Sequence, residues 1–356
     1  MFVDGWKLEV DTDPETGRIF QKESFGGPEK MKVKTEQTYL GDVISVDGKQ
    51  TKNVQARKNK ALGIITQITQ ILDSVFFGEF LFEVALILRS SRLLSSLLLN
   101  SEAWVNLSDR DIRALEQTDE HLLGKILESD SNTSNTFKYL ELGIYPIRFE
   151  IMKRKVIYLQ YILQQDKDSM LYKVFEATAQ NPLKNYFVKI CEKYLERLEI
   201  NLSFEDIEKM SKMSFKKLVK EKTKEVALKY LIKQKNSQSK ISTMNYEKLE
   251  IQEYLLDGNK NTTLSKLIFK ARGKSLEIKT HKKWKYEDTK CVGCKLEIET
   301  EDELLNCDGF ADTSELSDAN INYEMVFENS VENMIKVAKE IRKRLKVRQK
   351  LLDEPG

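Results

Sequence analysis

Three cysteines and one glutamate near the C-terminus have a spacing at which four side chains can bind one metal ion. They form Cys291-x-x-Cys294, followed by Glu303-x-x-x-Cys307. A gap of two residues lets both thiolates of a tight turn reach one tetrahedral zinc ion, and a carboxylate oxygen is also a zinc ligand. Three thiolates and a carboxylate would leave the bound ion at a net charge of about −2, in a segment that is already acidic. Two alternatives stay open, one zinc ion at this site and a metal-free loop with reduced thiols.

A second group that could do chemistry is a set of lysines on one side of a predicted helix. Residues 211–240 contain ten lysines and only two acids. Helical spacing puts five of these lysines on roughly one side, namely Lys212, Lys216, Lys217, Lys220 and Lys224. Clustered cations bind phosphate backbones because they release the counterions condensed on nucleic acid. The alternative is a lysine-rich helix face that contacts only solvent.

Residues 266–290 are also basic and include two aromatic residues, Phe269 and Trp284, which could stack on nucleobases. The cations expected to bind nucleic acid here are Lys270, Arg272, Lys282 and Lys283, together with the Trp284 ring. Residues 296–335, in contrast, contain twelve acids and no lysine or arginine. The last predicted helix then carries eight basic residues between Lys336 and Lys350. That helix could fold back on the acidic segment, which would hide its charge from nucleic acid.

The sequence offers no complete catalytic arrangement. It contains no P-loop, no dinucleotide fingerprint and no adjacent pair of aspartates. Asp42 and Asp47 stand alone and are explained by turn formation. We therefore predict no catalytic residue and no magnesium site in this chain. Cys191 is expected to be a small buried apolar side chain, and His281, which lies among lysines, is expected at the surface.

The elements that must position these residues are mainly helices. Five prolines and fifteen glycines in 356 residues favour long uninterrupted helices. Strand-forming residues and an Asp47-Gly48 turn predict a short β-hairpin over residues 30–48. From Ala61 the apolar residues recur at helical spacing, so the hairpin leads into a long amphipathic helix. Further helices are predicted over residues 80–99, after a cap at Ser108, and over residues 147–163.

Bulk composition excludes some classes of protein. The mean hydropathy is −0.47 and the net charge is +2, and charged residues interrupt the most apolar stretch, residues 76–99. We therefore expect a soluble protein that does not insert into membranes. Four cysteines in a chain of this size do not indicate a disulfide scaffold. There is no secretory signal, so an intracellular location, nuclear or cytoplasmic, is expected.

The hairpin and the helices after it resemble the C-terminal region of reverse transcriptases from non-LTR (LINE-type) retrotransposons. The resemblance covers roughly residues 28–350 and rests on Tyr39-Leu40-Gly41, Glu102-Ala103-Trp104, Leu115-Glu116 with Asp119, Leu140-Glu141-Leu142-Gly143 with Pro146, and Cys291-Val292-Gly293-Cys294. It implies that Tyr39, Leu40 and Gly41 form a primer grip, that the helices form a thumb, and that the cysteines form a zinc knuckle. The knuckle of the family has a histidine where this chain has Glu303.

We therefore expect a mainly α protein with a helical thumb-like domain, a small N-terminal β-hairpin, and a short C-terminal cysteine loop plus terminal helix. The expected divisions are 1–27, a poorly ordered or divergent palm remnant; 28–55, a primer-grip-like hairpin; 56–200, the thumb-like domain; 201–285, a basic helical region; 286–310, a degenerate zinc-knuckle-like loop; and 311–356, an acidic linker and basic terminal helix.

The resemblance also sets the expected function. It implies a nucleic-acid-binding fragment of a mobile-element RNA-directed DNA polymerase, which lacks the catalytic aspartates and is inactive alone. Its partner would be RNA or DNA, with a template-primer duplex implied by the family. One alternative is that the chain is part of an active polyprotein with an upstream palm and fingers segment. The other is a helical interaction protein that does not bind nucleic acid.

Overall fold

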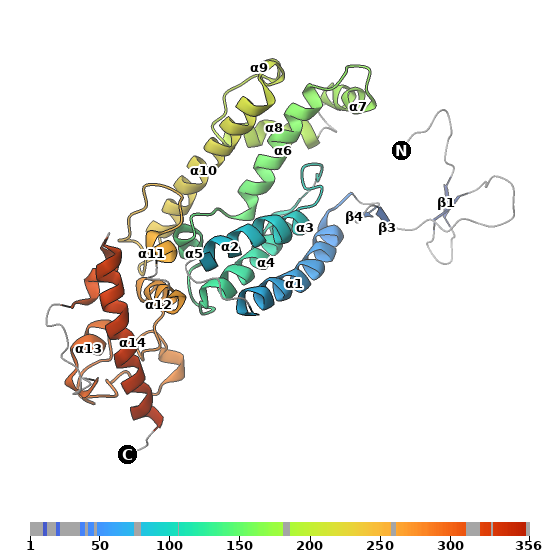
Figure 1. Ribbon diagram of the computed structural model, residues 1–356. Coiled ribbons are helices and arrows are strands. Elements are labelled where there is room, and N and C mark those ends of the chain that lie inside the picture. The colour runs from blue at the N-terminus through green and yellow to red at the C-terminus, as the bar shows by residue number, and fades with distance from the viewer. Residues whose placement is uncertain are drawn as a thin grey trace.

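Helices make up most of the described part of the chain, as the sequence predicts for a mainly α fold (Figure 1). The computed structural model describes residues 10–12, 19–21, 36–39, 42–45, 48–74, 80–105, 107–180, 186–257, 261–310, 321–328 and 330–353. Within these ranges the strands form two antiparallel pairs. β1 (Val10–Thr12) pairs with β2 (Ile19–Gln21), and β3 (Glu36–Tyr39) pairs with β4 (Asp42–Ser45). The second pair is the predicted hairpin.

One aspartate joins this hairpin to the first helix. Helix α1 (Thr51–Ser74) begins well before Ala61, and its first turns contact β4. The carboxylate of Asp42 accepts hydrogen bonds from Asn53 at 3.1 Å, Arg57 at 2.7 Å and Asn100 at 2.5 Å. Burial raises the pKa of Asp42, but the hydrogen bonds from these three donors outweigh burial and hold the pKa below its usual value. Asp42 therefore lies in a strand and anchors it, which corrects its interpretation as a turn residue; Asp47 lies outside the described residues.

The helices that follow α1 form a body with a continuous apolar core. They are α2 (Leu81–Leu88), the π-helical turn η2 (Arg89–Leu94), α3 (Ser95–Leu97), α4 (Asp109–Leu127) and α5 (Asn135–Glu141). Ser108 caps α4 as predicted, because its hydroxyl accepts a hydrogen bond from the Asp111 amide at 3.1 Å. The side chains of Ala61, Ile68 and Leu115 are fully buried where α1 packs on α4.

Two buried carboxylates of α4 are held in ion pairs. Asp119 on α4 binds both Nε and Nη2 of Arg89 at 2.7 Å. Glu116, one turn earlier on α4, binds Arg148 in the same two-pronged way, at 2.6 and 2.8 Å. Charges removed from water need such partners, because an unpaired buried charge is strongly destabilising. The acidic residues of the Leu115–Asp119 stretch thus have a structural role.

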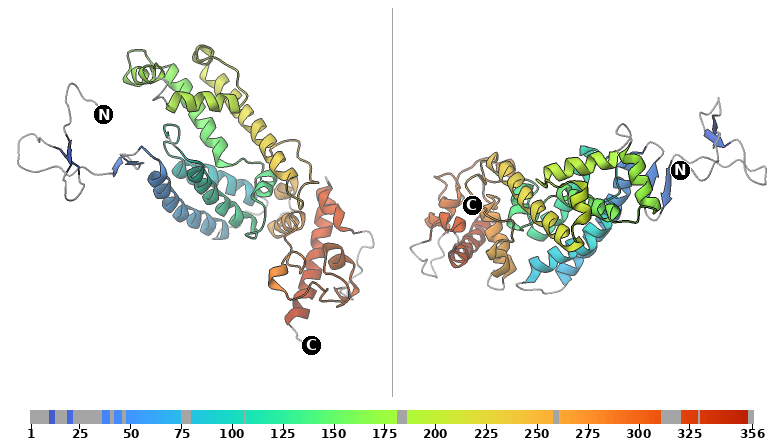
Figure 2. Two further views of the ribbon diagram at one scale, coloured as in Figure 1. Left: turned by 180° about the vertical axis from the view of Figure 1, so that it is seen from behind. Right: turned by 90° about the horizontal axis from the view of Figure 1, so that it is seen from above.

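A long arm extends from the body and consists mainly of α6 (Ile147–Leu163) and α10 (Lys212–Asn236) (Figures 1 and 2). The two helices are antiparallel, since Phe149 contacts Tyr230 near one end and Tyr161 contacts Lys212 near the other. Between them lie α7 (Met170–Ala179), α8 (Tyr186–Arg197) and α9 (Phe204–Lys209). The side chain of Gln160 fixes the turn before α10 by donating to the carbonyls of residues 207 and 210.

A second, smaller core lies at the C-terminal end of the chain. It is formed by residues of α12 (Thr262–Arg272), α13 (Glu301–Asn306) and α14 (Val331–Asp353), and of the 3₁₀ turns η5 (Asp308–Phe310) and η6 (Tyr323–Phe327). Another 3₁₀ turn, η4 (Lys283–Lys285), lies between α12 and α13 in the sequence. The short helix α11 (Glu253–Asp257) precedes α12. Leu304, Phe310 and Ile341 are fully buried there. These elements hold the cysteine loop.

Glu141, the last residue of α5, connects the body to this C-terminal part. Its fully buried carboxylate accepts hydrogen bonds from the hydroxyls of Tyr246 and Tyr254 and pairs with Arg272 at 3.1 Å. The next turn requires Gly143, whose φ is +63° and where a Cβ would lie 2.1 Å from the backbone of residue 250.

Candidate metal centre and basic helix face

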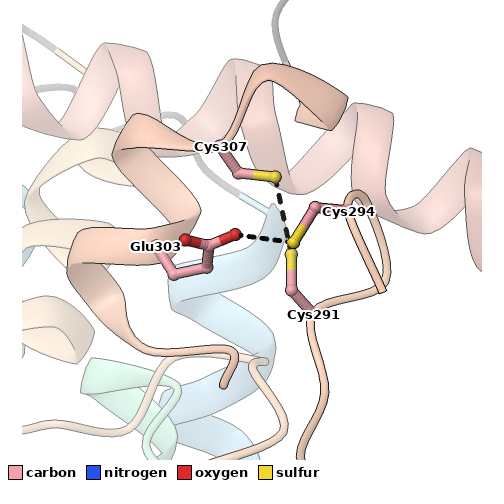
Figure 3. Close-up of side chains that lie close together, drawn as sticks. All are labelled: Cys291, Cys294, Glu303 and Cys307. Carbon is pink, nitrogen blue, oxygen red and sulfur yellow. Dashed lines mark hydrogen bonds between the residues drawn. The ribbon is translucent and has the colours of Figure 1, made fainter. Parts of the chain in front are cut away.

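The four residues of the predicted metal site lie together at the C-terminal core. One ligand atom from each of Cys291, Cys294, Glu303 and Cys307 can be chosen so that all four lie within 4.8 Å of one another. The thiol of Cys291 lies 3.6 Å from that of Cys307, and the thiol of Cys294 donates to Glu303 at 3.1 Å (Figure 3). All the cysteines are free thiols.

A tight turn and the first turn of a helix bring these four side chains together. The amide of Lys295 donates to the carbonyl of Cys291 at 2.9 Å, which closes the turn that carries the first two thiols. Thr300 caps α13 by accepting from the amide of Glu303 at 3.1 Å, so Glu303 lies in the first turn of that helix. The turn and the end of the Cys307 segment meet backbone to backbone, because a Cβ at Gly309 would lie 2.6 Å from Gly293.

The distance between the thiols of Cys291 and Cys307 fits a tetrahedral zinc ion, whereas the widest separations in the cluster, within 4.8 Å, would have to shorten around the ion. A zinc–sulfur bond of about 2.3 Å places two tetrahedral sulfur ligands roughly 3.7 Å apart, close to the 3.6 Å between Cys291 and Cys307. Cys291 and Cys307 are buried, and Cys294 and Glu303 are half-buried. The cluster is therefore compact, shielded and composed of suitable donors. In the bound state such an ion would cross-link the turn, α13 and the segment after it.

The electrostatics of the cluster favour protonated thiols. Burial raises the pKa of Cys291 far above its usual range, and burial together with the neighbouring Glu303 raises that of Cys307. Burial also raises the pKa of Glu303, but hydrogen bonds from the thiols outweigh burial and keep this pKa below its usual value. A divalent cation would have to displace thiol protons, so its affinity falls as the pH falls.

His281 and Cys191 do not belong to this cluster. Nε2 of His281 donates to the carboxylate of Glu301 at 2.8 Å, and the His281 side chain is only 7% exposed. The expectation of a surface histidine is therefore wrong, since His281 is half-buried and held against Glu301. Cys191 is fully buried in the arm, as predicted.

The five lysines predicted on α10 are all exposed to solvent. Phe215, Val219 and Ala227 fill the buried face of the helix, which leaves the lysines on the opposite and flanking sides. Lys217 lies 3.9 Å from Glu221. Among the residues that the structure describes, no acidic partner lies within 4.0 Å of Lys212, Lys216, Lys220 or Lys224. This basic helix face is therefore open to an external polyanion.

In the basic stretch 266–290, several side chains predicted to contact nucleic acid are buried. Arg272 is buried, pairs with Glu141 and donates to the carbonyl of Val326 at 2.8 Å, so it is a structural residue. Lys282 is 5% exposed and pairs with Asp130. Phe269 is fully buried and stacks on Phe137 with 4.8 Å between ring centroids. None of these three side chains can contact nucleic acid in this fold.

The other residues predicted to bind nucleic acid belong to this stretch and to the hairpin. Lys270 is half-buried and Lys283 is exposed, whereas the side chain of Trp284 lies outside the described residues. The backbone of Tyr39 pairs with that of Asp42 at the end of the hairpin. Leu40 and Gly41, predicted with Tyr39 to support a primer terminus, lie outside the described residues.

Sequence reasoning missed the aromatic row at the distal end of the arm. Phe187, Tyr158 and Tyr161 follow one another there, and the last ring is exposed. Tyr158 and Tyr161 lie in the predicted helix over residues 147–163, so their spacing of three was a usable signal for neighbouring rings. Their meeting with Lys212 depends on the packing of α6 on α10, which the sequence does not specify.

Among the helices that the structure describes, none has both the length and the apolar character needed to cross a lipid bilayer. Comparisons with models of protein families, with curated proteins and with solved structures found no match for this chain.

Proposed function

We propose that this chain binds RNA or DNA through the basic face of α10, and that its cysteine cluster binds one zinc ion that stabilises the C-terminal part. The observation that carries the proposal is the exposed position of the α10 lysines. Four of them lack an acidic partner within 4.0 Å among the described residues. A row of unneutralised cations gains free energy from counterion release when it meets phosphates.

The resemblance gives this binding a biological setting. We propose that the chain is a thumb and C-terminal region of a non-LTR retrotransposon reverse transcriptase, with β3 and β4 in the place of the primer grip. The order of a hairpin, a helical body, a basic arm and a cysteine cluster supports this assignment. No adjacent aspartate pair is present to hold catalytic metal ions, so polymerisation would need a palm from outside these residues.

The test of nucleic-acid binding uses two variants with the same loss of charge. The first replaces Lys212, Lys216, Lys220 and Lys224 on α10 by glutamine. The second, the matched control, replaces Lys339, Arg342, Lys346 and Lys350, which are exposed on α14. We expect the first variant to bind RNA and DNA about tenfold more weakly or worse, and the second to bind nearly as well as the wild type. Equal binding by all three proteins contradicts the proposal and supports a helical interaction protein.

Zinc binding is tested by metal analysis of the purified protein. The wild type should hold one zinc ion per chain, and Glu303→His should hold it at least as well, because imidazole is a good zinc ligand. Cys307→Ser should lose the ion, whereas Cys191→Ala, a change at a cysteine outside the cluster, should keep it. If neither the wild type nor Glu303→His holds zinc, the metal proposal is wrong.

The polymerase setting has its own test. Primer extension is compared between this chain alone and the chain joined to an upstream reverse-transcriptase palm. The proposal expects activity only in the joined protein. Extension by the chain alone, or inactivity of a folded joined protein, contradicts the assignment.

A further inference from the structure

Three aromatic rings form a row at the distal end of the arm that ends in solvent. Phe187 meets Tyr158 edge to face, with ring centroids 6.0 Å apart. Tyr158 in turn stacks on Tyr161, with centroids 5.9 Å apart and an angle of 16° between the planes. The Tyr161 end of this row reaches solvent, because Tyr161 is 46% exposed. The inner rings hold the orientation of the outer one.

The basic helix face of α10 begins beside this exposed ring. The ammonium group of Lys212 lies 6.0 Å from the centroid of the Tyr161 ring. Lys216, Lys220 and Lys224 continue the row of cations at intervals of one helical turn, over about 18 Å of helix. Met213, which follows Lys212 in the sequence, is 85% exposed. An aromatic surface and a row of phosphate-binding groups are therefore adjacent.

This combination matches single-stranded nucleic acid better than a duplex. In a duplex both faces of each base are covered by its neighbours, so the outer ring of a protein has no base to stack on. In a single strand an unpaired base can stack on an aromatic side chain while cations follow the phosphates. We propose that Tyr161 is a stacking platform for an unpaired base, and that the strand continues along the lysines of α10. This inference rests on the proposed nucleic-acid function and adds its preferred form.

The experiment measures binding of the full chain by fluorescence anisotropy. The probes are a labelled single strand of about 12 nucleotides, prepared as DNA and as RNA, and the DNA duplex of the same length. Tyr161→Ala removes the ring, and Tyr161→Phe keeps it. Phe80→Ala is the matched control, because Phe80 is 55% exposed but lies on the helical body, before α2.

We expect Tyr161→Ala to weaken single-strand binding about tenfold and to change duplex binding by less than about twofold. Tyr161→Phe and Phe80→Ala should behave like the wild type with every probe. If Tyr161→Ala binds single strands like the wild type, or weakens both forms equally, the platform is refuted while the nucleic-acid function stands. If the wild type binds neither form, both proposals are refuted together.

Discussion

Helices α10 and α14 are both rich in basic residues, yet of these two helices only α14 places arginines in buried ion pairs among the described residues. On α10 the five lysines of the basic helix face are exposed, and all but Lys217 have no acidic partner within 4.0 Å among the described residues, whereas Lys235 near the end of the helix is buried. On α14 two arginines are buried: Arg348 binds Glu299 at 2.7 and 2.9 Å, and Arg344 donates to the carbonyl of Cys307 at 3.0 Å. The terminal helix folds back on the acidic segment through these two arginines, but its charge is not hidden, because Lys339, Arg342, Lys346 and Lys350 stay exposed.

The difference shows that the number of basic residues does not decide whether a helix can bind nucleic acid. A cation that already has a buried carboxylate partner contributes to stability, and one without such a partner remains available to phosphate. Arg348 reaches the turn that precedes α13, and Arg344 reaches the segment after it. The basic terminal helix therefore helps to hold the candidate metal centre.

Removal of Arg348 should give the largest effect on stability. Arg348→Met leaves the fully buried carboxylate of Glu299 without its partner, and breaking a buried pair in this way costs about 3–5 kcal/mol. Chemical denaturation measures the loss. Lys350→Met, on the exposed side of the same helix, should change the free energy of unfolding by less than about 0.5 kcal/mol. A similar result for both variants would show that α14 is no more structural than α10.

A smaller effect is expected at Asp42, which is partly exposed. Asp42→Ala removes a carboxylate that accepts three hydrogen bonds and leaves Arg57 unpaired, at a cost of about 2–3 kcal/mol near neutral pH. The pKa of Asp42 is lowered by folding, so its contribution is present above the ordinary pKa of aspartate and disappears as the pH falls through the folded-state pKa.

The measurement compares the free energies of unfolding of the two proteins at neutral and at acid pH. The difference between wild type and Asp42→Ala should shrink in acid. Asp73→Ala, at an exposed position on α1, should show neither the loss nor the pH dependence. A difference that persists unchanged in acid would mean that the Asp42 charge is not what fixes the hairpin.

The smallest change in stability is expected on α10. Lys220→Gln alters a side chain that is exposed and lacks an acidic partner within 4.0 Å among the described residues, so the free energy of unfolding should change by less than about 0.5 kcal/mol. Thermal unfolding checks this. A loss of several kcal/mol would show that the Lys220 side chain stabilises the fold, as Arg348 of α14 does. The proposed difference between the two helices would then be wrong.

Local signals in the sequence predict the helices and the four-residue cluster well. The Ser108 cap, the helix over residues 147–163 and the hairpin depend on neighbouring residues, and the structure agrees with each prediction. The four residues that the cysteine spacing predicts to lie together do form one cluster. In these cases the information lies within one turn, one helix or one short motif.

The errors concern contacts between residues far apart in the chain. Arg272 and Lys282 look like free cations in the sequence, but their partners Glu141 and Asp130 lie on or before a distant helix. Phe269 looks like a stacking residue, but it packs on Phe137. Burial of a charge or a ring depends on which helices pack together, and periodicity within one helix does not contain that information.

The central claim is that the α10 lysines contact phosphates, and the salt dependence of binding tests it most directly. The measurement is the slope of log K against log salt concentration, for the wild type and for the α10 variant that lacks Lys212, Lys216, Lys220 and Lys224. We predict that the variant has a shallower slope by about 3, because four fewer phosphates are neutralised. Equal slopes for both proteins would contradict the account.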